Sequence, residues 1–301
     1  MRRAAAGPPL GQHEAVPRIL VTNDDGIDSE GLHVLARAME DHGDVVVIAP
    51  DREYSGASAA LGPLHLIRPE TQRAHVQGIR EAWAVSGPPG LCVMFGVMGA
   101  FGGPFDLVVA GINPGENIGR AVYHSGTVGA AVTARCRRVT GVAVSQAVQG
   151  PSVEGQGEED GVVDQHWETA ADVAGTVVAG LLAEPPNEAV AVNVNVPNVE
   201  PAQLRHWRST ILATLPARAL ASATLRPKPG HTGAYRIEMA WGEPSVLGPD
   251  TDGGAVAGGE VSITLLGAYT ETDLTGGPGL AGALSRRWSR ADEAGLGRTS
   301  P

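Results

Sequence analysis

The stretch RILVTNDDGIDSEGLHVLARAM, residues 18–39, decides the fold. Its first five residues, 18–22, are an apolar run that predicts a buried strand. Asp28 or Ser29 is suited to cap a following helix, in which apolar residues recur at spacings of three and four. A buried strand that leads through a short polar turn into an amphipathic helix is typical of an α/β protein.

The same alternation continues along the chain as far as about residue 200. Further strands are predicted at 44–49, 82–85, 106–110, 141–145 and 189–196, and helices at 88–101, 126–138 and 166–183. The strands are continuous Val- and Ile-rich runs, which is typical of a parallel sheet buried on both faces. In such sheets ligands bind at the carboxyl ends of the strands, so the strand ends are where chemistry is expected.

Beyond residue 200 the pattern changes. Residues 201–230 are mixed and interrupted by prolines, and strands are predicted at 235–241 and 260–266 without clear helical partners. We interpret residues 200–270 as an extension or arm on the α/β core. Residues 150–165 are acidic and glycine-rich, which favours a solvated loop.

Composition excludes some classes of protein. The chain of 301 residues has a net charge of −11, which argues against long nucleic acid as the main partner. A small anionic substrate remains acceptable where a metal ion reverses the local charge. The sequence contains no run of about 18 apolar residues, so no membrane span is expected. Only two cysteines occur, Cys92 and Cys136; we expect both to be buried, reduced thiols in a cytoplasmic protein.

The first strand ends in two adjacent carboxylates, Asp24 and Asp25. Their mutual repulsion is costly unless a positive charge lies nearby, and a divalent ion such as Mg²⁺, Mn²⁺ or Ca²⁺ suits hard oxygen ligands. The alternative is a solvated turn in which Gly26 takes a positive φ and leads into the helix.

Two other strand ends carry oxygen-bearing side chains. Ser55 lies in PDREYSGAS (50–58), and Asn113 and Asn117 lie in GINPGENIG (111–119). The segment YHSGTVG (123–129) then opens a helix, where free backbone N–H groups form an anion site. Ordinary N-capping by Ser125 is the alternative. Together, these segments predict a metal and phosphate pocket at the carboxyl edge of the sheet.

These motifs, in this order, resemble the SurE family of metal-dependent 5′/3′-nucleotidases. The segments that carry the resemblance are ILVTNDDGIDSEGLHVLARAM (19–39), APDREYSGASAAL (49–61), VSGPPGLCV (85–93), DLVVAGINPGENIG (106–119), YHSGTVGAA (123–131), VNVNVP (192–197) and, more weakly, TDGGAVAGGEVSITLL (251–266). The chain departs from the common pattern at Glu53, where many members have Asn, and in SITLL, where SITPL is commoner.

The resemblance implies a role for each matching position. Four residues would be the protein ligands of one divalent ion, Mg²⁺ or Mn²⁺: Asp24, Asp25, Ser55 and Asn113. Five residues would face the substrate phosphate or line its pocket: Asn23, Asn117, Ser125, Gly126 and Thr127.

The resemblance also implies a fold and an assembly. The fold would be a three-layer α/β/α Rossmann-like core with a mainly parallel sheet. Its C-terminal elements would extend toward a neighbouring subunit and swap into it, in a homodimer or homotetramer. We therefore expect a disordered tail at 1–17, a phosphatase domain at 18–270 that includes the 200–270 extension, and a C-terminal tail at 271–301.

The expected activity is hydrolysis of nucleoside 5′- or 3′-monophosphates. The ion would act as a Lewis acid and activate a bound water, which Asp24 would orient or deprotonate. His124 could protonate the leaving group, although a simple hydrogen-bonding role in the loop is the alternative. A second function remains open: a non-catalytic nucleotide- or metal-binding regulator on the same fold. The GxGxxG, Walker A and GxSxG motifs of other enzyme classes do not occur at the expected positions.

Overall fold

The computed structural model describes residues 16–148, 162–204 and 206–267. The chain divides into two units, Met1–Leu266 and Gly267–Pro301, and the helices and strands of the described residues lie in the first. The tails expected at 1–17 and 271–301 and the acidic loop expected at 150–165 lie wholly or largely outside the described residues.

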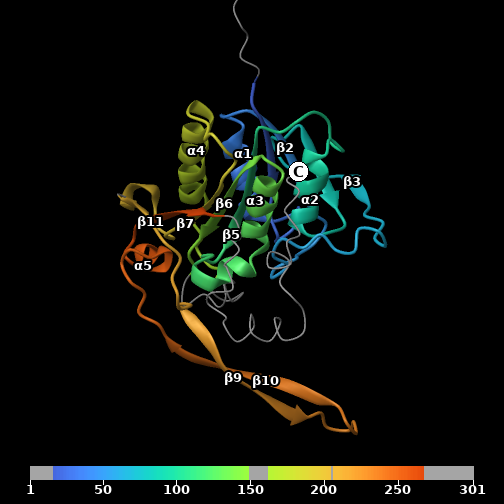
Figure 1. The fold of residues 1–301 in the computed structure, drawn as a ribbon, viewed down its shortest axis with the longest axis vertical. Coiled ribbons are helices and arrows are strands. Elements are labelled where there is room, and N and C mark those ends of the chain that lie inside the picture. The colour runs from blue at the N-terminus through green and yellow to red at the C-terminus, as the bar shows by residue number, and fades with distance from the viewer. Residues whose placement is uncertain (1–15, 149–161, 205, 268–301) are drawn as a thin grey trace, which may run out of the picture. The chain divides into compact units, whose positions relative to one another are not determined.

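A mostly parallel sheet forms the centre of the fold (Figure 1). Within the described residues its order is β3-β4-β2-β1-β5-β6-β7-β11-β8. The strands are β1 (Arg18–Thr22), β2 (Asp44–Pro50), β3 (Thr71–Arg73), β4 (Glu81–Val85), β5 (Leu107–Pro114), β6 (Thr140–Gln146), β7 (Ala191–Val196), β8 (Trp207–Ser209) and β11 (Val261–Leu266). The six strands from β4 to β7 pair in parallel, whereas β3 and β11 run antiparallel to β4 and β7.

Helices cover both faces of the sheet, so the expected three-layer α/β/α core is confirmed (Figure 1). One face packs against α1 (Glu30–Met39) and α4 (Trp167–Ala183), and the other against α2 (Pro89–Val97) and α3 (Gly126–Cys136). None of the helices in the described ranges is both long and apolar enough to cross a membrane.

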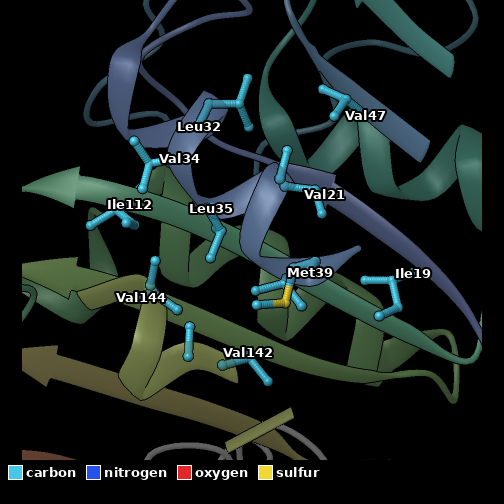
Figure 2. Close-up of a cluster of buried hydrophobic side chains, with 14 of the residues drawn as sticks. Ile19, Val21, Leu32, Val34, Leu35, Met39, Val47, Ile112, Val142 and Val144 are labelled. Atoms are coloured by element: carbon cyan, nitrogen blue, oxygen red, sulfur yellow. The ribbon is translucent and has the colours of Figure 1, made fainter. Parts of the chain in front are cut away.

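The segment that decides the fold forms β1 and α1 as its pattern predicts. Ser29 caps α1 by accepting a hydrogen bond from the Leu32 N–H. Leu32, Leu35 and Met39 then lie at one face of the helix, against Ile19 and Val21 of β1 (Figure 2). Each such buried side chain contributes about 1.5–3 kcal/mol relative to exposure, so this packing holds α1 against the sheet.

The other layer buries side chains of the opposite strand face. Leu20, Val46 and Ile48 pack with residues of α2 and α3 that include Cys92. Cys92 is buried as expected, but the expectation for Cys136 is wrong: it is exposed at the last position of α3. The helix pattern placed Cys136 correctly in sequence but did not indicate which side of this short helix faces solvent.

Several element boundaries differ from the prediction. The helix expected to reach Phe101 ends at Val97, followed by a glycine with positive φ at Gly99. β5 continues to Pro114, so the first part of the expected glycine-asparagine loop is strand. The short edge strand β3 was not predicted, because its three residues are exposed and have no apolar pattern.

The extension beyond residue 200 contains more structure than the sequence indicated. β9 (Arg218–Pro227) and β10 (Tyr235–Pro244) pair as an antiparallel hairpin separate from the main sheet. β9 falls in the stretch we read as irregular, and a short helix, α5 (Asp252–Ala257), precedes β11. Both strands of the hairpin are exposed along most of their length, so no buried run marks them.

Candidate functional site

The three strand ends predicted to carry chemistry meet at one edge of the sheet. β2, β1 and β5 are neighbours and run in parallel, so their carboxyl ends lie side by side. The Tyr54 N–H donates to the Asp24 carbonyl at 2.7 Å, and the Ser58 N–H donates to the His124 carbonyl at 3.0 Å. The loop that carries Ser55 is therefore held between the end of β1 and the start of α3.

Asp24 lies directly on the first turn of α3. Its carboxylate is buried and accepts hydrogen bonds from the Gly126 N–H, at 3.1 Å, and from the Thr127 hydroxyl. The approach is so close that a Cβ on Gly126 would lie 2.7 Å from the Asp24 Cβ and Oδ2 atoms. Only glycine fits there, which explains one residue of the SGT motif in physical terms.

The pKa of both adjacent carboxyls is raised, in each case mainly by burial. Burial is the main cause at Asp24, where the hydrogen bonds from Thr127 and Gly126 act in the opposite direction. The pKa of Asp25 is raised well above its usual range by burial, then by the charges of Asp24 and Glu53. Neither carboxylate forms an ion pair with a basic side chain in the described part of the chain. Two adjacent carboxylates without a basic partner are stabilised in their charged form by a cation.

Ser55 and Asn113 lie at the two flanking strand ends. The Ser55 hydroxyl donates to the Glu53 carboxylate at 2.8 Å, and the Asn113 amide nitrogen donates to the Gly115 carbonyl at 2.6 Å. Glu53, a departure from the family pattern, is thus at the site: it engages one expected ligand, and its charge acts on Asp25.

Asn23 closes the turn after β1. Its amide nitrogen donates to the Ser29 hydroxyl at 2.6 Å and to the Gly26 carbonyl at 3.0 Å. Gly26 has a φ of +105°, as the alternative of a turn requires, but Asp24 in this turn is buried and not solvated. Asn23 therefore holds the turn that carries Asp24 against Ser29, the N-cap of α1.

Asn117 is tied into the interior. Its side-chain nitrogen donates to the Ser145 hydroxyl at 2.9 Å, and its backbone N–H donates to the Asn195 side-chain oxygen at 2.8 Å. Its carbonyl accepts from the Asn193 side chain at 2.8 Å. In this structure Asn117 anchors the loop after β5, and its contact with substrate stays a prediction.

Ser125 acts as the N-cap of α3, the plainer of the two roles considered for it. Its hydroxyl accepts from the Val128 N–H at 3.1 Å. Gly126 and Thr127 direct their donors toward Asp24, so the predicted phosphate-binding turn and the predicted ligand turn form one unit. His124 is exposed beside them.

Sequence reasoning missed several residues that build this edge. Ser145, Asn193 and Asn195 hold the Asn117 loop from β6 and β7. Asn193 and Asn195 lie in VNVNVP (192–197), which carries part of the family resemblance but was given no role at the site. Asp252, at the start of α5, accepts a hydrogen bond from the Gly119 N–H of the same loop. Its signal was the Thr-Asp-Gly-Gly helix start, to which we gave no role.

The donor set suits a hard divalent cation. In the described ranges no three side chains of His, Cys, Asp or Glu are grouped as a metal site. An ion held by Asp24 and Asp25 would therefore complete its shell with hydroxyl, amide, carbonyl or water oxygens, which Mg²⁺, Mn²⁺ and Ca²⁺ accept.

Comparison with known proteins identifies the family. The family model described as "Survival protein SurE" matches residues 19–218. The chain belongs to the SurE family. Its relatives include a protein of Nitrosococcus oceani named 5′-nucleotidase SurE, 35% identical over 86% of this chain and 92% of its own length. A protein of Proteus mirabilis named 5′/3′-nucleotidase SurE is 37% identical over 83% of this chain and 89% of its own.

A solved structure agrees with this assignment. The SurE protein from Aquifex aeolicus superposes with a TM-score of 0.67 at 28% identity, covering 90% of this chain and 99% of that one. The resemblance inferred from the motifs is therefore confirmed, and so is the mostly parallel α/β fold. The SurE family match extends beyond the core into the start of β9.

Proposed function

We propose that this SurE family member is a nucleotidase, which hydrolyses nucleoside 5′- or 3′-monophosphates to nucleoside and phosphate. The observation that carries the proposal is the Asp24–Asp25 pair at the strand edge, hydrogen-bonded directly to the first turn of α3. A helix N-terminus attracts a phosphate. Paired carboxylates attract a cation, which offsets the negative charge of the phosphate. The names of the relatives point to the same reaction.

One divalent ion, Mg²⁺ or Mn²⁺, belongs to the proposal. It would be held by oxygen atoms of four residues: Asp24, Asp25, Ser55 and Asn113. When bound, such an ion supplies Lewis-acid stabilisation of the phosphoryl oxygens and activation of the attacking water.

The chain's own residues supply binding, orientation and a base. We expect the first turn of α3, with Ser125, Gly126 and Thr127, to bind the phosphate and to stabilise the charge on its oxygens as the ester bond breaks. Asp24 orients the attacking water and accepts its proton, because its carboxylate faces the same turn. Asn23 and Asn117 keep the two turns in place and line the substrate pocket.

The expected partners are a small nucleotide and other copies of the chain. The hairpin of β9 and β10 has two different faces: Leu225 opposes Ile237 on one, and Arg226 forms an ion pair with Glu238 at 2.9 Å on the other. Leu225 and Ile237 are exposed by 64% and 66%. We expect this apolar face to contact a second subunit in a homodimer or homotetramer, and the enzyme to act in the cytoplasm.

The test is a phosphate-release panel. Nucleoside 5′- and 3′-monophosphates are incubated with the purified protein in Mg²⁺, in Mn²⁺ and in EDTA. We expect release of phosphate with either ion and none in EDTA. Nucleotide binding without release in any arm would reject the enzyme and support the non-catalytic binding protein instead.

A further inference from the structure

A buried carboxylate of the C-terminal region reaches the loop that leads into the site. Asp252 is fully buried at the start of α5. Its Oδ2 atom accepts from the Gly119 N–H at 2.7 Å, and its Oδ1 atom accepts from the N–H groups of Ala213 and Gly253 at 2.9 Å and 2.8 Å. A buried carboxylate is costly, so a side chain that spends its bonding capacity on three main-chain donors holds those segments together.

Gly119 is connected to the site by one short turn. It begins the 3₁₀ helix η1 (Gly119–Tyr123), and within η1 the Ala121 carbonyl accepts from the Ser125 N–H at 3.0 Å. The next residue, Gly126, donates to Asp24. Asp252 and Asp24 therefore hold the two ends of the same segment, residues 119–126.

The contact leaves Gly119 little freedom. Its φ is +51°, and a Cβ there would lie 2.8 Å from the Ala213 carbonyl oxygen. The neighbouring Ile118 packs on α5, since a Cβ on Gly253 would lie 2.6 Å from the Ile118 Cδ1 atom. The segment is thus held by α5 and by the loop that carries Ala213.

We propose that Asp252 is a positioning residue, which fixes Gly119 and thereby the turn that presents Ser125, Gly126 and Thr127 at the site. This inference rests on the proposed function. The alternative is that Asp252 serves only to anchor α5, without effect on the reaction.

Asp252→Asn separates these roles with little change in volume. The amide has one oxygen instead of two, so either Gly119 or the pair Ala213 and Gly253 faces an N–H₂ donor and loses its acceptor. We expect kcat to fall at least about tenfold while KM changes less than about threefold, since the transition state depends most on the position of the turn.

Thr251→Ala is the matched control. The Thr251 hydroxyl accepts from the Gly254 N–H at 3.2 Å and donates to the Gly248 carbonyl at 2.7 Å, so its loss weakens the cap of α5 alone. We expect this variant to melt earlier and keep kcat within about twofold of wild type. If Asp252→Asn also melts earlier but keeps its kcat, Asp252 is an anchor of α5 and the proposal is overturned.

Hydrogen exchange gives a second readout that does not depend on activity. In peptides that cover residues 117–127, Asp252→Asn should exchange faster than wild type, and Thr251→Ala should not. Unchanged exchange in Asp252→Asn overturns the proposal. This readout still decides if the wild type releases no phosphate, in which case the proposed function fails separately.

Should Asp252→Asn not fold, Gly119→Ala takes its place. The added methyl group would lie 2.8 Å from the Ala213 carbonyl oxygen, so we expect it to displace Gly119 while the Asp252 side chain itself is unchanged. Faster exchange over 117–127 and a lower kcat support the proposal, and wild-type values for both overturn it.

Discussion

Asp24 links two parts of the chain that the sequence separates by 102 positions, since its carboxylate accepts the Gly126 N–H. The bond from the Thr127 hydroxyl makes the link a double one. At this scale the site consists of a carboxylate held in one orientation, next to a second carboxylate whose pKa is raised by burial and by its neighbours. Orientation and charge are therefore set by very few atoms.

Thr127→Val tests the orientation of Asp24. Valine keeps the shape of threonine but removes the hydroxyl that donates to Asp24. We expect kcat to fall by about ten- to a hundredfold, because Asp24 loses the donor that orients its carboxylate. The free energy of unfolding should fall by only about 1–3 kcal/mol, measured by urea denaturation. A variant with wild-type kcat would show that the hydroxyl has no part in catalysis.

Gly126→Ala tests the close approach at the same residue. A methyl group would lie 2.7 Å from Asp24 and must push the turn away. We expect nearly complete loss of phosphate release and a destabilisation of about 1–3 kcal/mol. Gly103→Ala is the control, because a Cβ there meets nothing within 4 Å. Equal activity of the two variants would contradict the assigned contact.

The residues of the site differ in how far sequence could predict them. Asp24, Asp25 and Ser55 follow strands whose apolar runs are plain, so their edge of the sheet could be inferred. Asp252 lies 133 positions from Gly119, and no local pattern connects them. The role of Asn117 in holding a loop likewise depends on Ser145 and Asn195, which only the folded chain brings to it.

At the scale of elements, the first turns of α3 and α5 decide the shape of the site. α3 begins after its N-cap Ser125, and donors of its first turn bind Asp24. α5 begins after its N-cap Thr251 and holds η1 through Asp252. The buried strands and long helices were predictable because burial imposes a pattern. The hairpin of β9 and β10 was predictable only in part, since exposure leaves its strands without one.

The contribution of Asp252 to the free energy of unfolding should change with pH in a defined direction. Burial raises the pKa of the Asp252 carboxyl, so the folded protein keeps this proton to a higher pH than the unfolded chain does. The stability gained from Asp252 is therefore full below the ordinary carboxyl range, about pH 4, and falls as the pH rises through the folded-state pKa. The stability advantage of wild type over Asp252→Asn should shrink over this rise, as measured by urea denaturation. An advantage that grows with pH would contradict the assigned shift.

At the scale of the whole molecule, the net charge of −11 and the expected anionic substrate are compatible because the site is local. The net charge describes the entire surface. The phosphate would bind at one place, beside the N-terminus of α3 and a cation held by Asp24 and Asp25, which are two of the 33 acidic residues. Two glycines also have a role at the site, since Gly26 and Gly126 allow turns that a side chain would block.

The hairpin allows a test of assembly. Ile237→Asp places a charge on the apolar face of the hairpin, whereas Glu238→Gln changes only the opposite face. We expect the first variant to shift the protein to a smaller species in light scattering coupled to size-exclusion chromatography, because burying an unpaired charge at an interface is costly. The second should keep the wild-type mass. An unchanged mass for Ile237→Asp would exclude this face as a subunit contact.

The measurement that tests the central claim most directly is phosphate release by Asp24→Asn in Mn²⁺, with Asp28→Asn as the control. Asp28 is exposed four positions further along and contacts neither α3 nor Asp24 among the described hydrogen bonds. We predict that Asp24→Asn folds and loses turnover by at least about a thousandfold, while Asp28→Asn keeps wild-type turnover. Wild-type turnover by folded Asp24→Asn would contradict the assignment of this strand edge as the active site.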